Sequence, residues 1–119
     1  MKRDMDLARS ILLALEESNS NQGWVDIKIE GHAPEEVWYH IMLLHEAGLI
    51  KALDVGSFGR DEWKAERLTW AGHEFLESSR NEGIWKRAKK IVAEKAGGLT
   101  FEVLKQVLIQ LGKEAVSGA

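Results

Sequence analysis

Residues 37–50 read Val-Trp-Tyr-His-Ile-Met-Leu-Leu-His-Glu-Ala-Gly-Leu-Ile, and this stretch decides the fold. Its apolar residues recur at helical spacing, which predicts a helix with one buried face. Pro34 suits the first turn of that helix, where its missing N–H costs nothing. Gly48 suits the left-handed residue that ends it. The stretch therefore predicts a helix that leads directly into a strand beginning near Ile50.

Alternation and turn residues predict the elements around this helix. Val25, Ile27 and Ile29 alternate with polar residues, which is typical of a strand with one buried face. Thr69 is a suitable N-cap for the helix after the second hairpin strand. In chain order we expect helix 3–18, strand 24–30, helix 34–47, strands 50–55 and 63–68, helices 69–80 and 84–96, and a last helix that Thr100 caps.

The order of these elements predicts an α+β fold. A helical core with a small three-stranded antiparallel sheet, whose last two strands form a hairpin, is typical of a winged helix-turn-helix domain. We expect this domain over residues 1–80. Residues 81–119 are expected to form a C-terminal helical hairpin, packed on the same unit or on a dimer partner.

Several stretches of the chain resemble known families. Residues 37–50 resemble the recognition helix of arsenic-repressor-like winged-helix regulators, and residues 68–76, Leu-Thr-Trp-Ala-Gly-His-Glu-Phe-Leu, resemble the run that follows their wing. With the opening Met-Lys-Arg-Asp-Met-Asp-Leu and with residues 84–86, Ile-Trp-Lys, nearly the whole chain resembles the bacterial and phage family catalogued as domain of unknown function 2513. The resemblance implies a winged-helix protein of bacterial or phage origin. That family has no established activity, so no catalytic residue carries over.

The composition restricts the classes of function. With 119 residues, of which 45% are hydrophobic, the chain is long enough for one globular domain. A net charge of −3 excludes binding to nucleic acid by bulk positive charge alone. The absence of Cys excludes disulfides and thiolate metal sites. No apolar run approaches the ~20 residues of a membrane helix and no leader is recognisable, so we expect a cytoplasmic protein without a membrane partner.

The expected recognition helix carries an acidic and apolar outer face. No Lys or Arg occurs between Lys28 and Lys51, whereas base edges in the major groove are usually read by Arg, Lys, Asn or Gln. Three interpretations stay open: base readout by this face, packing of its aromatic residues in the core, and a protein-binding patch. The residues of this candidate face are Glu35, Trp38, Tyr39, Met42 and Glu46.

Basic residues gather elsewhere, in the hairpin and along the penultimate helix. If the chain binds duplex DNA, these residues are expected to contact phosphates, and each contact steepens the salt dependence by ~0.9 in log–log slope. A solvated helix face is the alternative interpretation. The candidate phosphate-binding residues are Arg60, Lys64, Lys86, Arg87, Lys89 and Lys90.

The remaining polar residues form no recognisable reaction centre. The four His residues lack the spacing of metal ligands, and the sequence contains neither a phosphate-binding glycine loop nor a nucleophile elbow. We therefore expect no catalytic residue, no bound metal, no cofactor and no enzymatic activity. His40, near the inner face of its helix, is expected to be a hydrogen-bonded and partly buried residue.

Two functions fit these observations. The first is a small DNA-binding transcriptional regulator of bacterial or phage origin, which presents Tyr39 and Met42 to a groove of double-stranded DNA. The second is a protein–protein interaction module that keeps the winged-helix fold without binding DNA. Apolar residues outside the core stripes of the terminal helices, such as Leu7 and Val103, favour a homodimer in either case.

Overall fold

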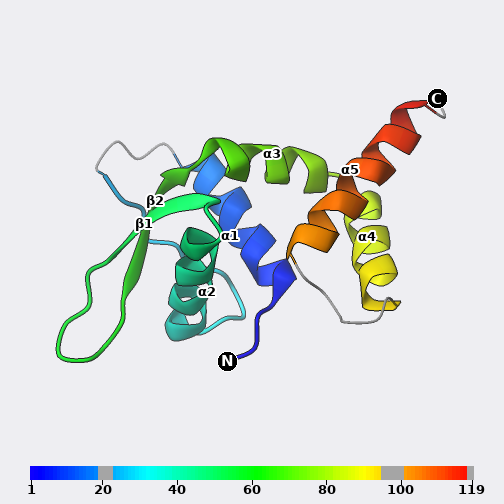
Figure 1. The fold of residues 1–119 in the computed structure, drawn as a ribbon. Coiled ribbons are helices and arrows are strands. Elements are labelled where there is room, and N and C mark those ends of the chain that lie inside the picture. The colour runs from blue at the N-terminus through cyan, green and yellow to red at the C-terminus, as the bar shows by residue number, and fades with distance from the viewer. Residues whose placement is uncertain (19–22, 95–100, 118–119) are drawn as a thin grey trace. The chain divides into compact units, whose positions relative to one another are not determined.

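Figure 1 shows the computed structural model, which describes residues 1–18, 23–94 and 101–117. The chain divides into two compact units, Met1–His73 and Glu74–Ala119, and each is described by itself. Among the described helices, none is long and apolar enough to cross a membrane. The described elements are α1 (Met5–Glu17), α2 (Pro34–Glu46), β1 (Ile50–Asp54), β2 (Trp63–Leu68), α3 (Trp70–Ser79), α4 (Glu82–Glu94) and α5 (Phe101–Ser117).

α1 begins at a side-chain cap. The Asp4 carboxylate accepts the N–H groups of Asp6 at 2.9 Å and of Leu7 at 3.1 Å, so two donors of the first turn are paired. Leu7, Ile11 and Leu12 are at most 1% exposed and form the buried face of this helix. The predicted helix 3–18 is thus confirmed with slightly shorter bounds. Leu7 belongs to the core and not to a free face.

α2 follows the predicted pattern. Pro34 is its first residue, and Val37, Ile41 and Leu44 are buried. Gly48 has a φ of +78°, the left-handed conformation that glycine adopts without strain. α2 packs against α1 and both strands, and its opposite face points outward.

The hairpin has the predicted strands. β1 and β2 are antiparallel, and their pairing runs from Ile50 opposite Leu68 to Asp54 opposite Trp63. The register shifts at a bulge after Lys51. Ile50 and Leu68 are buried, so the base of the hairpin belongs to the core while its tip extends outward.

Residues 24–30 do not form the predicted third strand, so the expectation of a three-stranded sheet is wrong. A single isolated bridge joins Val25 to Ala65, with the Val25 N–H donating to the Ala65 carbonyl oxygen at 2.6 Å. Ile27 is buried and the polar residues on either side of it are exposed, as the alternation predicts. The alternation of apolar and polar residues predicts which side chains face the core. It does not predict how many backbone groups form hydrogen bonds to a neighbouring strand.

The connection between α1 and α2 departs from a helix-turn-helix. It runs over residues 18–33, and its described part, residue 18 and residues 23–33, contains no helix. A helix-turn-helix joins its two helices by a turn of about three or four residues. The structure confirms a mixed α and β fold with a two-stranded hairpin, whereas the winged-helix assignment is not confirmed.

α3 begins at a hydrogen-bonded clasp. Thr69 Oγ1 accepts the Gly72 N–H at 3.1 Å, which confirms the predicted N-cap, and donates to the Gly48 carbonyl oxygen at 2.6 Å. The Thr69 N–H donates to the Leu49 carbonyl oxygen at 2.9 Å. A Cβ on Gly72 would overlap that same carbonyl oxygen, so the close approach requires glycine. We call Gly48, Leu49, Thr69 and Gly72 the clasp.

The second unit is built on α4 and α5, which pack together. Trp85 is 2% exposed, and its ring meets the ring of Phe75 edge-on with 6.2 Å between centroids. These helices confirm the predicted C-terminal helices over the described residues. The expected Thr100 cap and the end of the expected helix 84–96 lie outside the described residues.

Candidate functional site

A small hollow opens beside α2 and the start of β2 in the first unit. Its volume is about 180 Å³. Four of the five residues predicted for the candidate face of α2 line it, together with residues from the hairpin and from the start of the chain. We call it the α2 hollow. Its lining residues are Met1, Glu35, Trp38, Tyr39, Met42, Asp61 and Trp63.

α2 positions its part of the lining through helical spacing. Glu35, Trp38, Tyr39 and Met42 stand at i, i+3, i+4 and i+7, so they share the face opposite the buried residues. Trp38, Tyr39 and Met42 are half-buried, and Glu35 is exposed. Glu46, the fifth predicted residue, is exposed at the end of α2 and does not line the hollow.

The hairpin loop is closed by Asp54, and this closure places Asp61. Asp54 Oδ1 accepts the Gly56 N–H at 2.9 Å and the Glu62 N–H at 3.1 Å. These hydrogen bonds, that from Gly56 first, hold the pKa of Asp54 below its ordinary value of 3.8. Because the backbone of Glu62 is fixed in this way, its neighbour Asp61 is held where it lines the α2 hollow.

Trp63 brings a second indole to the α2 hollow from β2. Its ring centroid lies 5.6 Å from that of His45 on α2. Within the described residues, neither Trp63 Nε1 nor His45 Nδ1 has a hydrogen-bond partner, although both atoms are buried. Sequence reasoning did not assign Trp63, Asp61 or Met1 to a site. The available signal was a large aromatic residue at the start of a strand rich in charged residues.

The α2 hollow combines aromatic and thioether groups with carboxylates. Tyr39 and the two indoles supply ring faces, Met42 supplies an adaptable apolar surface, and Glu35 and Asp61 supply negative charge. α2 itself contains three Glu and no Lys or Arg. Ring faces and carboxylates both attract cations, and Met adapts to apolar groups of varied shape. The hollow therefore suits an apolar group that lies next to a positive charge.

The hairpin holds two of the predicted phosphate-binding residues, Arg60 and Lys64. Lys64 Nζ forms an ion pair with Asp26 Oδ1 at 2.9 Å, which ties the predicted phosphate ligand to a carboxylate. Arg60 is exposed in the hairpin loop. Of these two predicted phosphate-binding residues, only Arg60 remains in open solvent.

The other predicted basic residues lie on α4, in the second unit. Lys86, Arg87 and Lys90 are exposed at helical spacing. Lys89 is half-buried, and its Nζ lies 5.6 Å from the centroid of the Trp85 ring, a cation–π contact. The basic face of α4 is therefore a stripe of three exposed cations, and the fourth covers the core. Arg60 and Lys64 belong to the other unit.

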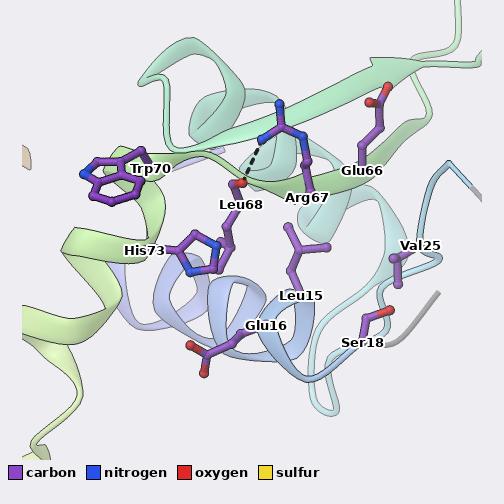
Figure 2. A pocket seen from close by; sticks show the side chains of 9 residues that line it. All are labelled: Leu15, Glu16, Ser18, Val25, Glu66, Arg67, Leu68, Trp70 and His73. Atoms are coloured by element: carbon purple, nitrogen blue, oxygen red, sulfur yellow. Dashed lines mark hydrogen bonds between the residues drawn. The ribbon is translucent and has the colours of Figure 1, made fainter. Parts of the chain in front are cut away.

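A wider hollow in the first unit has a volume of about 500 Å³ (Figure 2). Trp70 at its edge is 81% exposed, and Arg67 Nη1 donates to the Leu68 carbonyl oxygen at 3.2 Å. Carboxylates and basic groups both line it, so its charge does not select one class of ligand. The lining residues are Leu15, Glu16, Ser18, Val25, Glu66, Arg67, Leu68, Trp70 and His73.

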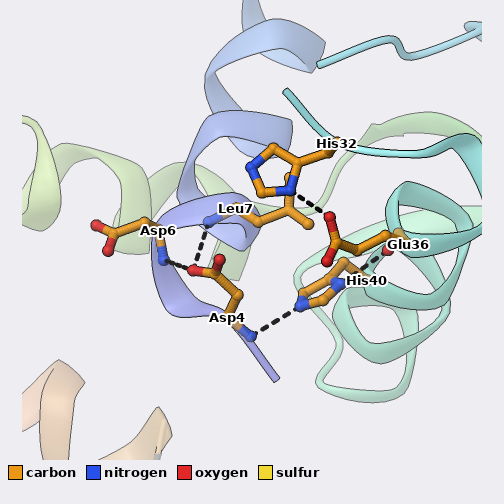
Figure 3. Close-up of polar contacts among 6 residues, drawn as sticks. All are labelled: Asp4, Asp6, Leu7, His32, Glu36 and His40. Carbon is orange, nitrogen blue, oxygen red and sulfur yellow. Dashed lines mark hydrogen bonds and ion pairs between the residues drawn. The ribbon is translucent and has the colours of Figure 1, made fainter. Parts of the chain in front are cut away.

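Two His residues form a polar network where α1 and α2 begin (Figure 3). His40 Nε2 accepts the Asp4 N–H at 2.8 Å, and His40 Nδ1 donates to the Glu36 carbonyl oxygen at 2.8 Å. His32 Nδ1 contacts the Glu36 carboxylate. His40 is 1% exposed, so the predicted hydrogen-bonded residue is confirmed and is more deeply buried than expected. The described residues contain no group of three or more His, Asp or Glu side chains that could hold a metal.

Two comparisons identify the family of the chain. A family model described as "Hypothetical protein (DUF2513)" matches residues 2–98, so the chain belongs to that family. An uncharacterized protein of Haemophilus influenzae is 41% identical over 108 residues, which cover 90% of this chain and 92% of that protein. No solved structure matches the chain. The predicted family is confirmed, whereas the resemblance to arsenic-repressor-like regulators is not confirmed.

Proposed function

We propose that this protein is a non-enzymatic interaction module that binds a basic and apolar segment of a partner protein in the α2 hollow. One observation carries the proposal: Trp38, Tyr39 and Met42 remain half-buried beside exposed carboxylates on a helix without Lys or Arg. Aromatic and Met side chains are enriched at the centres of protein interfaces. A contiguous apolar patch rimmed by polar residues often marks an interaction site.

The same observation disfavours base readout by α2. The outer face of α2 carries Glu35 and Glu46, and both would face the phosphates that line a DNA groove. Like charges in contact repel, and carboxylates contact bases far less often than Arg, Lys, Asn or Gln. A cationic peptide meets neither obstacle, because the carboxylates attract it.

Fluorescence anisotropy with short labelled peptides tests this function. We expect a peptide of alternating Arg and Leu to bind, and two matched peptides, alternating Glu and Leu or alternating Arg and Ser, to bind much more weakly. Tyr39→Ala and Met42→Ala should each weaken binding to the first peptide. Glu17→Ala, at an exposed carboxylate of α1, is the matched control and should leave binding unchanged. Equal binding of all three peptides would contradict the proposal that the α2 hollow selects a segment that is both basic and apolar.

Duplex DNA is the second candidate partner, and the exposed stripe on α4 is the observation that favours it. Lys86, Arg87 and Lys90 are spaced so that they can reach neighbouring phosphates on one side of a duplex. In this alternative the protein is a winged-helix regulator whose Arg60 adds a contact from the hairpin. Lys64 contributes less than expected because it already pairs with Asp26.

A mobility-shift titration with nonspecific duplex at two salt concentrations tests the second candidate. Binding at low salt that weakens as salt rises would support it, and no shift at low salt would rule it out. Replacing Lys86, Arg87, Lys89 and Lys90 by Glu should then abolish the shift. Unchanged affinity in this variant would show that the stripe is a solvated face.

A homodimer and a cytoplasmic location stay predictions. Val103 on α5 is 44% exposed and lies outside the core stripe of its helix, so we propose it as a contact with a second copy. Sedimentation of the wild-type chain and of Val103→Lys tests this, because a dimer through α5 should dissociate in the variant.

A further inference from the structure

The segment Met1–Asp4 runs beside the α2 hollow before α1 begins. Met1 lines the hollow with Tyr39 and Met42, although its side chain is largely exposed. Lys2 and Arg3 follow it, so the segment is apolar at one end and positively charged beyond. An apolar group next to positive charges is the kind of ligand that the α2 hollow and its carboxylates suit.

A hydrogen bond from Asp4 to His40 ties this segment to α2. Figure 3 shows Asp4 between the two helices, where its N–H meets His40 Nε2 at 2.8 Å. A backbone N–H can only donate, so Nε2 must be the unprotonated acceptor. The Glu36 carbonyl oxygen can only accept, so Nδ1 must carry the proton. The two backbone partners therefore fix His40 as one neutral tautomer.

The Asp4 side chain connects this segment to α1. Its carboxylate caps α1 through the N–H groups of Asp6 and Leu7 while its own N–H is bound to α2. Asp4 is thus the fixed end of the segment. Met1, Lys2 and Arg3, which precede it, are exposed.

We propose that residues Met1–Asp4 form a strap that occupies one edge of the α2 hollow, held by the bond between the Asp4 N–H and His40, and that a partner segment must displace it. This inference rests on the proposed function, because it names what competes with the partner. The strap is an internal ligand: it presents Met1 to the hollow, and Lys2 and Arg3 give it two positive charges. His40 is a positioning residue that sets how firmly the strap is held.

Methyl-labelled methionine tests the position of the strap without any partner. The chain has three Met residues. The Met1 methyl should show nuclear Overhauser contacts to Tyr39 and Met42 in the free protein, while buried Met5 serves as the internal reference. Absence of the Met1 contacts would overturn the strap, whatever the peptides do.

Variants test whether the strap competes. His40→Leu removes the acceptor, so it should release Met1 from the hollow and speed hydrogen exchange at the Asp4 amide. It should also raise affinity for the alternating Arg and Leu peptide by about two- to tenfold, the equivalent of one net hydrogen bond. His40→Gln offers another acceptor and should restore part of the wild-type behaviour. His32→Gln, whose ring meets the Glu36 carboxylate, is the matched control and should leave the strap in place.

A second variant avoids the buried core. Lys2→Ser with Arg3→Ser changes only exposed residues and should also raise peptide affinity, because the strap loses the two positive charges with which it would compete for the carboxylates. Unchanged affinity in both released variants, with the peptide bound to wild type, would overturn the competition. If the peptide binds none of these proteins, the proposed function fails, and the Met1 contacts and Asp4 exchange still decide the strap.

Discussion

Helices α2 and α4 have the same length and each contains one Trp residue, but they use it differently. α4 buries Trp85 and turns basic residues toward solvent. α2 leaves Trp38 half-buried beside Tyr39 and Met42 and turns Glu residues outward. The α4 face has the composition of an ordinary solvated surface. The α2 face combines half-buried apolar groups with exposed carboxylates.

The two units also differ in net charge, as α2 and α4 do. Residues 1–73 contain thirteen acidic and eight basic residues, a net charge of −5, and residues 74–119 contain six acidic and eight basic residues, a net charge of +2. The total of −3 therefore combines two parts of opposite sign. The proposed binding face on α2 therefore differs from the α4 face in having negative charge beside half-buried aromatic groups.

The largest expected difference between the helices concerns their Trp residues. Trp85→Ala should lower the free energy of unfolding by about 3–5 kcal/mol, because it empties a buried site against Phe75. Trp38→Ala should cost about 1–2 kcal/mol, since a half-exposed side chain loses less on truncation. Urea unfolding followed by circular dichroism measures both. Equal costs would break the comparison, because Trp38 would then be a core residue.

The next effect concerns the clasp that fixes the end of α2. Gly72→Ala places a Cβ against the Leu49 carbonyl oxygen and should destabilise by about 1–3 kcal/mol. Gly112→Ala in α5 is the matched control, because nothing lies within 4 Å of its Cβ. That control should stabilise slightly through helix propensity. If both variants gain stability in urea unfolding, the close approach at Gly72 is not rigid.

A smaller, pH-dependent effect concerns Asp54 beside the α2 hollow. Its folded pKa lies below the unfolded value of 3.8, so its contribution to stability is present above that pH and is lost as pH falls through the folded pKa. Wild type should therefore be more stable than Asp54→Asn at neutral pH, and the difference should shrink in acid. Thermal unfolding across this pH range provides the measurement.

The smallest expected stability change comes from reversing exposed charges. Lys86→Glu with Lys90→Glu, and separately Glu35→Lys with Asp61→Lys, should each shift the free energy of unfolding by less than about 0.5 kcal/mol. Only the second pair should abolish binding of the Arg and Leu peptide, as anisotropy would record. Loss of peptide binding in the α4 pair would mean that both faces contribute and would break the comparison.

Most of the fold could be predicted because it depends on neighbours in sequence. The helices, the two hairpin strands and the Thr69 cap follow from spacing and local chemistry within a few residues, whereas the register with its bulge after Lys51 was not predicted. The third strand could not be predicted, because it depends on pairing with a distant part of the chain. There, Val25 finds one partner in Ala65 and the ladder does not continue.

The candidate site likewise has a part that could be predicted from nearby residues and a part that could not. Helical spacing alone predicted that Trp38, Tyr39 and Met42 share a face, and they line one hollow. Asp61 and Trp63 were missed because only folding brings the hairpin beside α2. Lys64 was assigned to phosphate because its charge was visible in the sequence, whereas its pairing with Asp26 was not.

The clasp also fixes the base of the hairpin, so that changes in the hairpin loop need not disturb the core. Thr69 and Gly72 fasten its base to the end of α2, while Asp54 fastens the loop at the other end. Beyond these two fastenings, Phe58 is fully exposed and packs on nothing that would be lost. The loop is therefore a suitable insertion point for a fluorescent reporter, or for new chain ends in a split protein. A reporter placed there would stand a few residues from Asp61, which lines the α2 hollow.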